Sequence, residues 1–101
     1  PLVYFVGAGP LAERETVRCA ERLRDVFPSL GLAVNSGGGS FKNQMKKADR
    51  SGAVVAVLIG DDELASQQYT IKYLREEGKQ IKIGWSGIND LISSLLPDTT
   101  R

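Results

Sequence analysis

The stretch from residue 35 to 60, NSGGGSFKNQMKKADRSGAVVAVLIG, constrains the fold of this chain more than any other. It opens with a glycine-rich turn, after which Ser40 stands where its side chain can cap a helix. Ser51 and Gly52 end that helix, and residues 53–59 (AVVAVLI) form a continuous apolar run. Because the run lacks the alternation of a half-exposed strand, we predict a strand that is covered on both faces.

The helix predicted after Ser40 has two contrasting sides at helical spacing. One side carries Phe41, Gln44, Met45 and Ala48. The other side carries Lys42, Asn43, Lys46, Lys47 and Arg50. We therefore expect one side to pack on a core and the other to face water or an anion.

The rest of the chain supplies strands and helices joined by short connections. Strands are predicted at 2–6, 32–34, 69–74 and 80–85, with helices at 11–27 and 88–96 and a single helical turn or loop at 61–66. Pro97 should stop the last helix and leave 98–101 as a frayed tail. The order predicts an α/β fold with a mixed sheet of five strands, in which a parallel βαβαβ core is extended by a C-terminal hairpin and flanked by three main helices.

The first long helix has its own predicted orientation. Its buried stripe is expected to contain Val17, Ala20, Leu23 or Val26, and Phe27. Charges of alternating sign cover its other sides, which favours a solvated surface over a binding face.

Composition sets the limits on function. The 101 residues are 42% hydrophobic and carry a formal net charge of +1, so we expect one domain, 1–101, that does not bind nucleic acid by bulk charge. The chain contains no histidine and only one cysteine, Cys19, which falls in a helical pattern and should be a buried hydrophobe. Histidine-based catalytic triads and common zinc sites are thereby excluded within the chain. No apolar stretch is long enough to span a membrane, which favours an intracellular, cytoplasmic protein. The start at Pro1, without methionine, suggests a fragment of a longer polypeptide.

Two glycine-rich segments invite comparison with nucleotide-binding loops. The segment GAGP at residues 7–10 lacks the third glycine of a dinucleotide fingerprint and the acidic residue that would follow a second strand. The segment GGGS at residues 37–40 lacks the GK[ST] of a phosphate-binding loop. Judged from these residues alone, a structural turn is the simpler interpretation of both.

Several candidate binding residues nevertheless gather around the predicted unit. Gly37, Gly38, Gly39 and Ser40 offer backbone N–H groups at the positive end of a helix dipole, beside the cations of the same helix. This combination favours RNA phosphates as a ligand. Asp61, Asp62 and Glu63 follow the end of the predicted central strand, where ligands bind in open α/β sheets. A carboxylate such as Glu63 and an amine such as Lys72 can bond to guanine, although solvated surface charges or, less favourably, a metal site would also explain them.

The run from Gly37 to Glu63, GGGSFKNQMKKADRSGAVVAVLIGDDE, resembles the C-terminal anticodon-binding domain of class II aminoacyl-tRNA synthetases, those of histidyl type in particular. The resemblance covers nearly the whole chain, and LVYFV and TIKYL are similar to two strands of that family. It implies a sheet of five strands and a role in recognising the tRNA(His) anticodon loop, GUG, for a parent enzyme.

The resemblance also implies residue roles and partners. Gly37, Gly38, Gly39 and Ser40 would form the RNA-binding turn, and Glu63 and Lys72 would recognise bases. In the interpretation that follows from this, Lys42, Asn43 and Lys46 on the basic side of the same helix would contact the RNA backbone. Histidine–tRNA ligation would occur in a separate catalytic domain of the parent chain, which would bind ATP and Mg²⁺ and form a homodimer. No catalytic residue and no cofactor are expected in this domain itself.

A second hypothesis stays open, and one departure from the family motivates it. Ser66-Gln67-Gln68 replaces an Asn-Gly turn, and the turn at 76–79 is longer. The chain could therefore be a protein-interaction or dimerisation module of a synthetase-like regulatory paralogue that does not recognise tRNA. A free-standing enzyme is disfavoured, because no nucleophile has a base beside it.

Overall fold

A computed structural model describes residues 1–96 of the chain. Along the chain the elements are β1 (Val3–Gly7), α1 (Pro10–Val26), β2 (Leu32–Val34), α2 (Phe41–Arg50), β3 (Val55–Ile59), α3 (Asp61–Ser66), β4 (Gln68–Tyr73), β5 (Gln80–Gly84), the 3₁₀ turn η1 (Trp85–Gly87) and α4 (Ile88–Leu95). The predicted end of the last helix at Pro97 and the predicted tail 98–101 lie outside the described residues.

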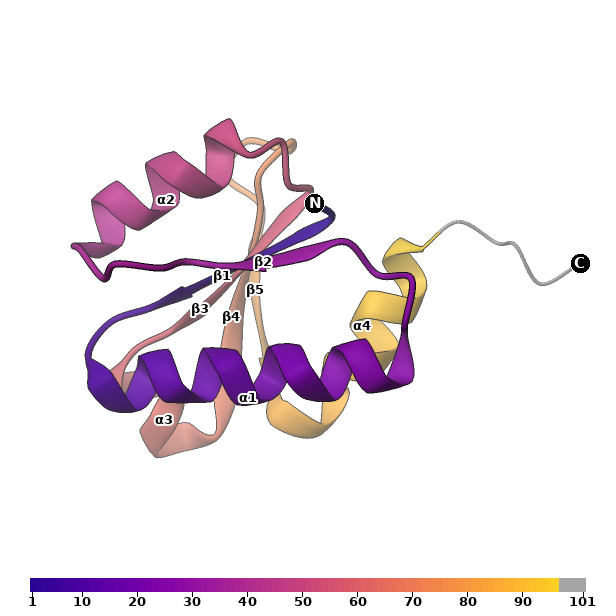
Figure 1. Cartoon of the computed structure of the whole chain (residues 1–101), viewed down its shortest axis with the longest axis horizontal. Helices are drawn as coiled ribbons and strands as arrows, with labels where there is room; N and C mark the ends of the chain where they lie inside the picture. Colours follow the sequence, from indigo (N-terminus) through magenta and orange to yellow (C-terminus); the bar gives the residue numbers. More distant parts are fainter. Residues whose placement is uncertain (97–101) are drawn as a thin grey trace, which may run out of the picture.

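The strands form one five-stranded sheet in the order β2-β1-β3-β4-β5. β1 pairs in parallel with β2 and β3, whereas β4 is antiparallel to both β3 and β5. Figure 1 shows α2 on one side of this sheet and α1, α3 and α4 on the other. The predicted α/β fold, a parallel core extended by an antiparallel hairpin, is confirmed.

Alternate residues of the central strands supply two cores, one on each side of the sheet. Val3, Phe5, Val55 and Val57 belong to the core on the side of α1 and α4. On the opposite side a smaller core packs beneath α2 and contains Tyr4, Val6, Ala48, Ala53 and Ala56. β3 therefore lies between two layers, which is why its sequence is apolar without alternation.

The orientation predicted for α1 was wrong in part. Ala20 and Leu23 are fully buried as expected, but Val17 and Val26 are 46% and 52% exposed. Ala12, Glu15, Thr16 and Cys19 face the sheet as well. The small residues on this side let the helix approach the strands closely. The two polar residues of the set, Glu15 and Thr16, both take part in hydrogen bonds. Thr16, for example, donates to the Glu13 carbonyl oxygen at 2.6 Å.

Glu15 is a buried carboxylate that the sequence pattern did not single out. Its Oε2 accepts a hydrogen bond from the Tyr69 hydroxyl at 3.0 Å and pairs with Arg22 at 3.2 Å. Burial raises the pKa of Tyr69 far above its ordinary value, so this phenol keeps its proton and donates it. The Tyr69 ring also stacks on Trp85, with ring centroids 5.7 Å apart. The network joins α1 to β4 and to the start of the C-terminal segment.

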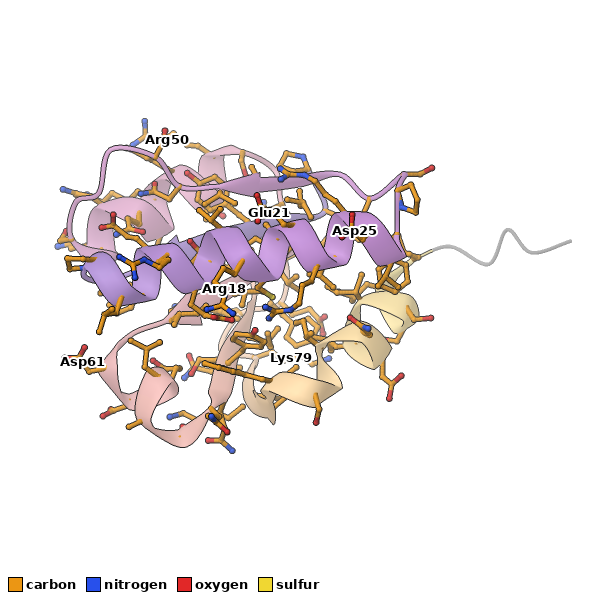
Figure 2. All side chains as sticks on the ribbon, turned by 60° about the horizontal axis from the view of Figure 1, so that its bottom comes forward. Arg18, Glu21, Asp25, Arg50, Asp61 and Lys79 are labelled. Carbon is orange, nitrogen blue, oxygen red and sulfur yellow. The ribbon has the colours of Figure 1, made fainter. Side chains whose placement is uncertain are left out.

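The remaining predictions for α1 concern its charges and its cysteine. Figure 2 shows Arg18, Glu21 and Asp25 along its solvent side, in agreement with a hydrated face of mixed charge. Cys19 is buried, as predicted, and burial raises the pKa of its thiol. Within residues 1–96, no helix is long and apolar enough to cross a membrane.

Candidate nucleic-acid interface

The glycine turn before α2 adopts a backbone that few other residues could. Gly37, Gly38 and Gly39 all have positive φ angles, of 86°, 65° and 99°. Ser40 then caps α2, because its hydroxyl oxygen accepts a hydrogen bond from the backbone N–H of Asn43 at 3.2 Å. The turn therefore leads directly into the positive end of the helix dipole, as the sequence predicted.

Gln44 holds this turn in place and was missed as a site residue. Its side-chain Nε2 donates to the carbonyl oxygens of Gly7 and Gly39, both at 2.8 Å. Its Oε1 accepts from the Gly7 backbone N–H at 3.1 Å. A polar residue on the apolar side of the predicted helix was the signal that could have revealed it. The amide thus connects the end of β1, the glycine turn and α2.

Glu63 follows β3 in the first turn of α3, and its carboxylate already has partners within the chain. Oε1 accepts from the backbone N–H of Gly60 at 2.8 Å, and Oε2 accepts from the Thr70 hydroxyl at 2.9 Å. Lys82 on β5 completes the group, with its ammonium 3.6 Å from Oε2. A Cβ atom at Gly60 would lie 3.2 Å from Glu63 Oε1 and 3.3 Å from the Phe41 ring, so glycine permits this close packing.

These contacts determine how Glu63 titrates. Burial alone would raise the pKa of its carboxyl, but the hydrogen bonds from Thr70 and Gly60 and the nearby Lys82 lower it overall. A lowered pKa in the folded state means that the carboxylate stabilises the fold above the ordinary glutamate pKa of about 4.3. That contribution is lost as the pH falls through the folded-state pKa.

We therefore expect Glu63→Gln to lower the free energy of unfolding by about 1–2 kcal/mol at pH 7, because charge-assisted hydrogen bonds become neutral ones. The difference from the unsubstituted chain should shrink as the pH falls below the ordinary glutamate range and through the lowered folded-state pKa of Glu63, where the glutamate itself becomes protonated. Urea denaturation across a series of pH values from 7 downward measures this. Asp62→Asn, an exposed neighbour on α3, is the control. A cost for Glu63→Gln that stays constant across the whole acid series would contradict the assignment.

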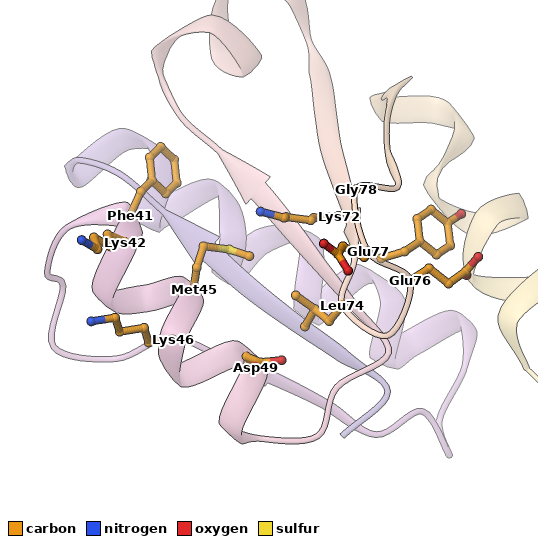
Figure 3. Close-up of a pocket in the computed structure, with 11 residues that line it drawn as sticks. Phe41, Lys42, Met45, Lys46, Asp49, Lys72, Leu74, Glu76, Glu77 and Gly78 are labelled. Carbon is orange, nitrogen blue, oxygen red and sulfur yellow. The ribbon is translucent and has the colours of Figure 1, made fainter.

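A cleft of about 630 Å³ lies between α2 and the turn that joins β4 to β5, and we call it the α2–hairpin cleft. Phe41, Met45 and Leu74 give it an apolar surface. Figure 3 shows Lys42 and Lys46 extending from α2, and Lys72 extending from β4 toward that helix. The cleft thus combines half-buried apolar side chains with cations from two different elements.

The three lysines of the cleft make no ion pair within the described residues, unlike the other cations of the hairpin. Arg75 pairs with Asp49 at 2.6 Å, Lys79 with Glu76 at 3.5 Å and Lys82 with Glu63 at 3.6 Å. In the described part of the chain, none of Lys42, Lys46 and Lys72 takes part in an ion pair. They are therefore available to an anionic ligand without first breaking an internal contact.

The sheet places Lys72 on the same face as Thr70 and Lys82, the two side chains that contact Glu63. Lys72 is directly opposite Ala56, and Thr70 is opposite both Leu58 and Lys82. Ala56 and Leu58 pack in the core beneath α2, so the side chains of β4 and β5 on this face continue the surface beside that helix.

The structure brings together some of the predicted residues and separates others. Lys42, Lys46 and Lys72 line the α2–hairpin cleft, whereas Glu63 and the glycine turn lie beside it. Asn43 is exposed on α2. Lys82, Thr70, Glu76 and Glu77 were not predicted, because strand pairing and the hairpin turn bring them to this surface. Within residues 1–96, no cluster of three or more acidic or cysteine side chains could hold a metal ion.

Comparison with known proteins gives this arrangement a context. Residues 3–95 match the family described as the anticodon binding domain. A histidine–tRNA ligase from Hydrogenovibrio crunogenus is 40% identical over 99 residues, which cover 98% of this chain and 23% of that protein. The chain therefore spans about a quarter of the length of that relative.

Solved structures show the same fold. The apo histidyl-tRNA synthetase of S. aureus is 27% identical with a TM-score of 0.77, over 88% of this chain and 25% of that one. A histidyl-tRNA synthetase from Nostoc sp. (24% identity, TM-score 0.81) is matched over 95% of this chain and 22% of its own. The RNA binding domain of threonyl-tRNA synthetase from Cryptosporidium parvum (9% identity, TM-score 0.80) is matched over 92% and 23%. The last two share the fold alone.

The fold and the family match over residues 3–95 thus define the class of this protein as an anticodon-binding domain. The chain belongs to the anticodon-binding domain family. Within that family it is similar to the domains of histidine–tRNA ligases, so the resemblance predicted from the sequence is confirmed.

Proposed function

We propose that this domain binds the anticodon loop of tRNA(His) for a histidine–tRNA ligase of which it forms part. The observation that carries the proposal is the α2–hairpin cleft, where lysines without ion partners within residues 1–96 adjoin an apolar surface. Single-stranded RNA is bound in this way, with cations along the backbone and bases against apolar or aromatic side chains. Family membership and the similarity to histidine–tRNA ligases support the choice of ligand.

Each predicted residue has a role in this proposal. The amides of Gly37, Gly38, Gly39 and Ser40, together with Lys42, Asn43 and Lys46, contact the RNA backbone. Lys72 and Glu63 contact bases from the open sheet face. A base that bonds to Glu63 would have to share or displace its contact with Lys82.

The proposal extends to the parent protein. Its catalytic domain would bind ATP and Mg²⁺ and join histidine to the tRNA in the cytoplasm, and the parent would be a homodimer. The present domain would contribute the selection of the tRNA. Nothing in the cleft favours the alternative of an interaction module without tRNA recognition.

A titration with RNA tests the proposal. We expect the chain to bind an anticodon stem-loop carrying GUG, and to bind a stem-loop of the same stem carrying AUA less tightly, by about tenfold for each changed base. Affinity should fall steeply as salt rises. Fluorescence anisotropy at several salt concentrations measures both effects. Equal affinity for the two RNAs would contradict anticodon recognition, and no binding at low salt would favour the interaction module.

A further inference from the structure

The α2–hairpin cleft contains carboxylates to which the proposed function gives no role. Asp49 lines it but pairs with Arg75 at 2.6 Å, and Glu76 lines it but pairs with Lys79 at 3.5 Å. Glu77 lines it too, and within residues 1–96 its carboxylate makes no ion pair and no side-chain hydrogen bond. Glu77 is therefore the cleft carboxylate whose oxygens are both available to a ligand.

The position of Glu77 relative to Lys72 is the second observation. Lys72 lies on β4 and Glu77 in the turn that joins β4 to β5, and both line the cleft. Figure 3 shows Glu76 directed away from α2. The β4–β5 hairpin thus contributes both a donor and an acceptor to the lining of the cleft. The opposite side of the cleft presents the Phe41 ring and the Met45 side chain.

These groups fit one flat, polar-edged ring better than a phosphate or an extended aliphatic chain. Apolar side chains, one of them aromatic, suit the face of a nucleobase. Guanine carries adjacent acceptors, O6 and N7, next to the donors N1–H and N2–H₂. A lysine can donate to the acceptors, and a carboxylate can accept from both donors. The cleft volume of about 630 Å³ is within the usual range for ligand sites, about 300–1,000 Å³.

We propose that the α2–hairpin cleft holds one unstacked guanine of the anticodon, with Lys72 donating to O6 and Glu77 accepting from N1–H and N2–H₂. The assignment rests on the proposed function and adds Glu77 as a specificity-determining residue. It is distinct from the contact of Glu63, which lies beside the cleft. An anticodon GUG offers two guanines, of which the cleft takes one.

The same chemistry discriminates against the other bases. Adenine presents its N6 amine where Lys72 needs an acceptor, and an unprotonated N1 acceptor where Glu77 needs a donor. Cytosine likewise places its N4 amine opposite the lysine. Uracil offers a carbonyl to Lys72 and a single N–H to Glu77, which leaves one carboxylate oxygen without a donor.

Inosine isolates the contact with Glu77, because it differs from guanine only by the missing N2 amine. We expect the chain to bind a GUG stem-loop at least about tenfold more tightly than the stem-loop in which inosine replaces the bound guanine. Inosine at the other guanine position of the anticodon should change the affinity by a different factor. Glu77→Ala should bring the guanine-to-inosine affinity ratio at the cleft position close to one, as measured by fluorescence anisotropy.

Glu76→Ala is the matched control, because it removes the same charge from the same turn and should leave the ratio unchanged. Lys72→Met should weaken both RNAs to the same degree, because guanine and inosine share O6. One result would overturn the guanine assignment and leave the proposed function standing. The unsubstituted chain would prefer GUG over AUA, but at each of the two guanine positions the guanine-to-inosine affinity ratio would be the same for Glu77→Ala as for Glu76→Ala. If the unsubstituted chain does not distinguish GUG from AUA, the proposed function itself fails.

Discussion

Replacing both Lys42 and Lys46 by methionine is expected to weaken binding of the tRNA(His) anticodon stem-loop by roughly 25-fold at 0.1 M salt. Each lysine that contacts a phosphate of single-stranded RNA contributes about 0.7 to the slope of log K against log salt. Two lost contacts therefore reduce the slope by about 1.4, and the affinity at 0.1 M salt falls accordingly. Both side chains are exposed on α2 and make no ion pair within the described residues, so the fold should be unaffected.

Lys47→Met combined with Arg50→Met is the matched control. It removes two charges from the same helix, at positions that do not line the α2–hairpin cleft. We expect its effect on the slope to be clearly smaller. Affinity of the Lys42 and Lys46 variant should fall uniformly for GUG and AUA stem-loops, because phosphate contacts carry no sequence information. A control variant with the same loss, or a loss confined to GUG, would contradict the backbone role.

The fold was predictable because local patterns and tertiary structure agree in this chain. The apolar run that ends at Ile59 has no alternation, and the structure places that strand between two helical layers. Glycine and serine residues flank α2 at both ends, so the start and end of this helix could also be predicted from the sequence. The orientation of α1 could not be predicted in full, because Val17 and Val26 are strongly hydrophobic but are exposed in the structure. The burial of Glu15 depends on Tyr69, which is 54 residues away in the sequence.

The candidate site was predictable only where it lies within one segment. The glycine turn and the lysines of α2 are close in sequence, and the cap formed by Ser40 follows from local rules. Lys82 and Glu77 reach the site through the register of β4 and β5 and the turn that joins them, which no local pattern encodes. Thr70 and Lys82 give Glu63 contacts that its sequence position did not suggest. Its predicted role toward bases remains a prediction.

Gln44→Leu is expected to have the largest effect on stability, lowering the free energy of unfolding by about 3–5 kcal/mol. Gln44 is 1% exposed, and leucine would fit the space but could neither donate nor accept. The Gly7 N–H, the Gly7 carbonyl and the Gly39 carbonyl would each lose the partner they now have at 3.1, 2.8 and 2.8 Å. Gly7 is buried, and buried backbone groups left without partners cost about 1–3 kcal/mol each, of which relaxation recovers part. Gly39 is exposed, so its carbonyl can bond to water instead and adds little to the cost.

The same substitution should also loosen the glycine turn, because Gln44 is the side chain that joins Gly39 to the end of β1. RNA affinity should then fall even at temperatures where the chain is folded, since the amides of the turn are no longer held in place. Urea denaturation measures the first effect, with a shift of about 15 °C in thermal midpoint as a second readout. Asn43→Ala, on the exposed side of the same helix, should change stability by no more than about 0.5 kcal/mol. If the Gln44→Leu variant unfolded at the same urea concentration as the unsubstituted chain, the glycine turn would have to be held by other contacts.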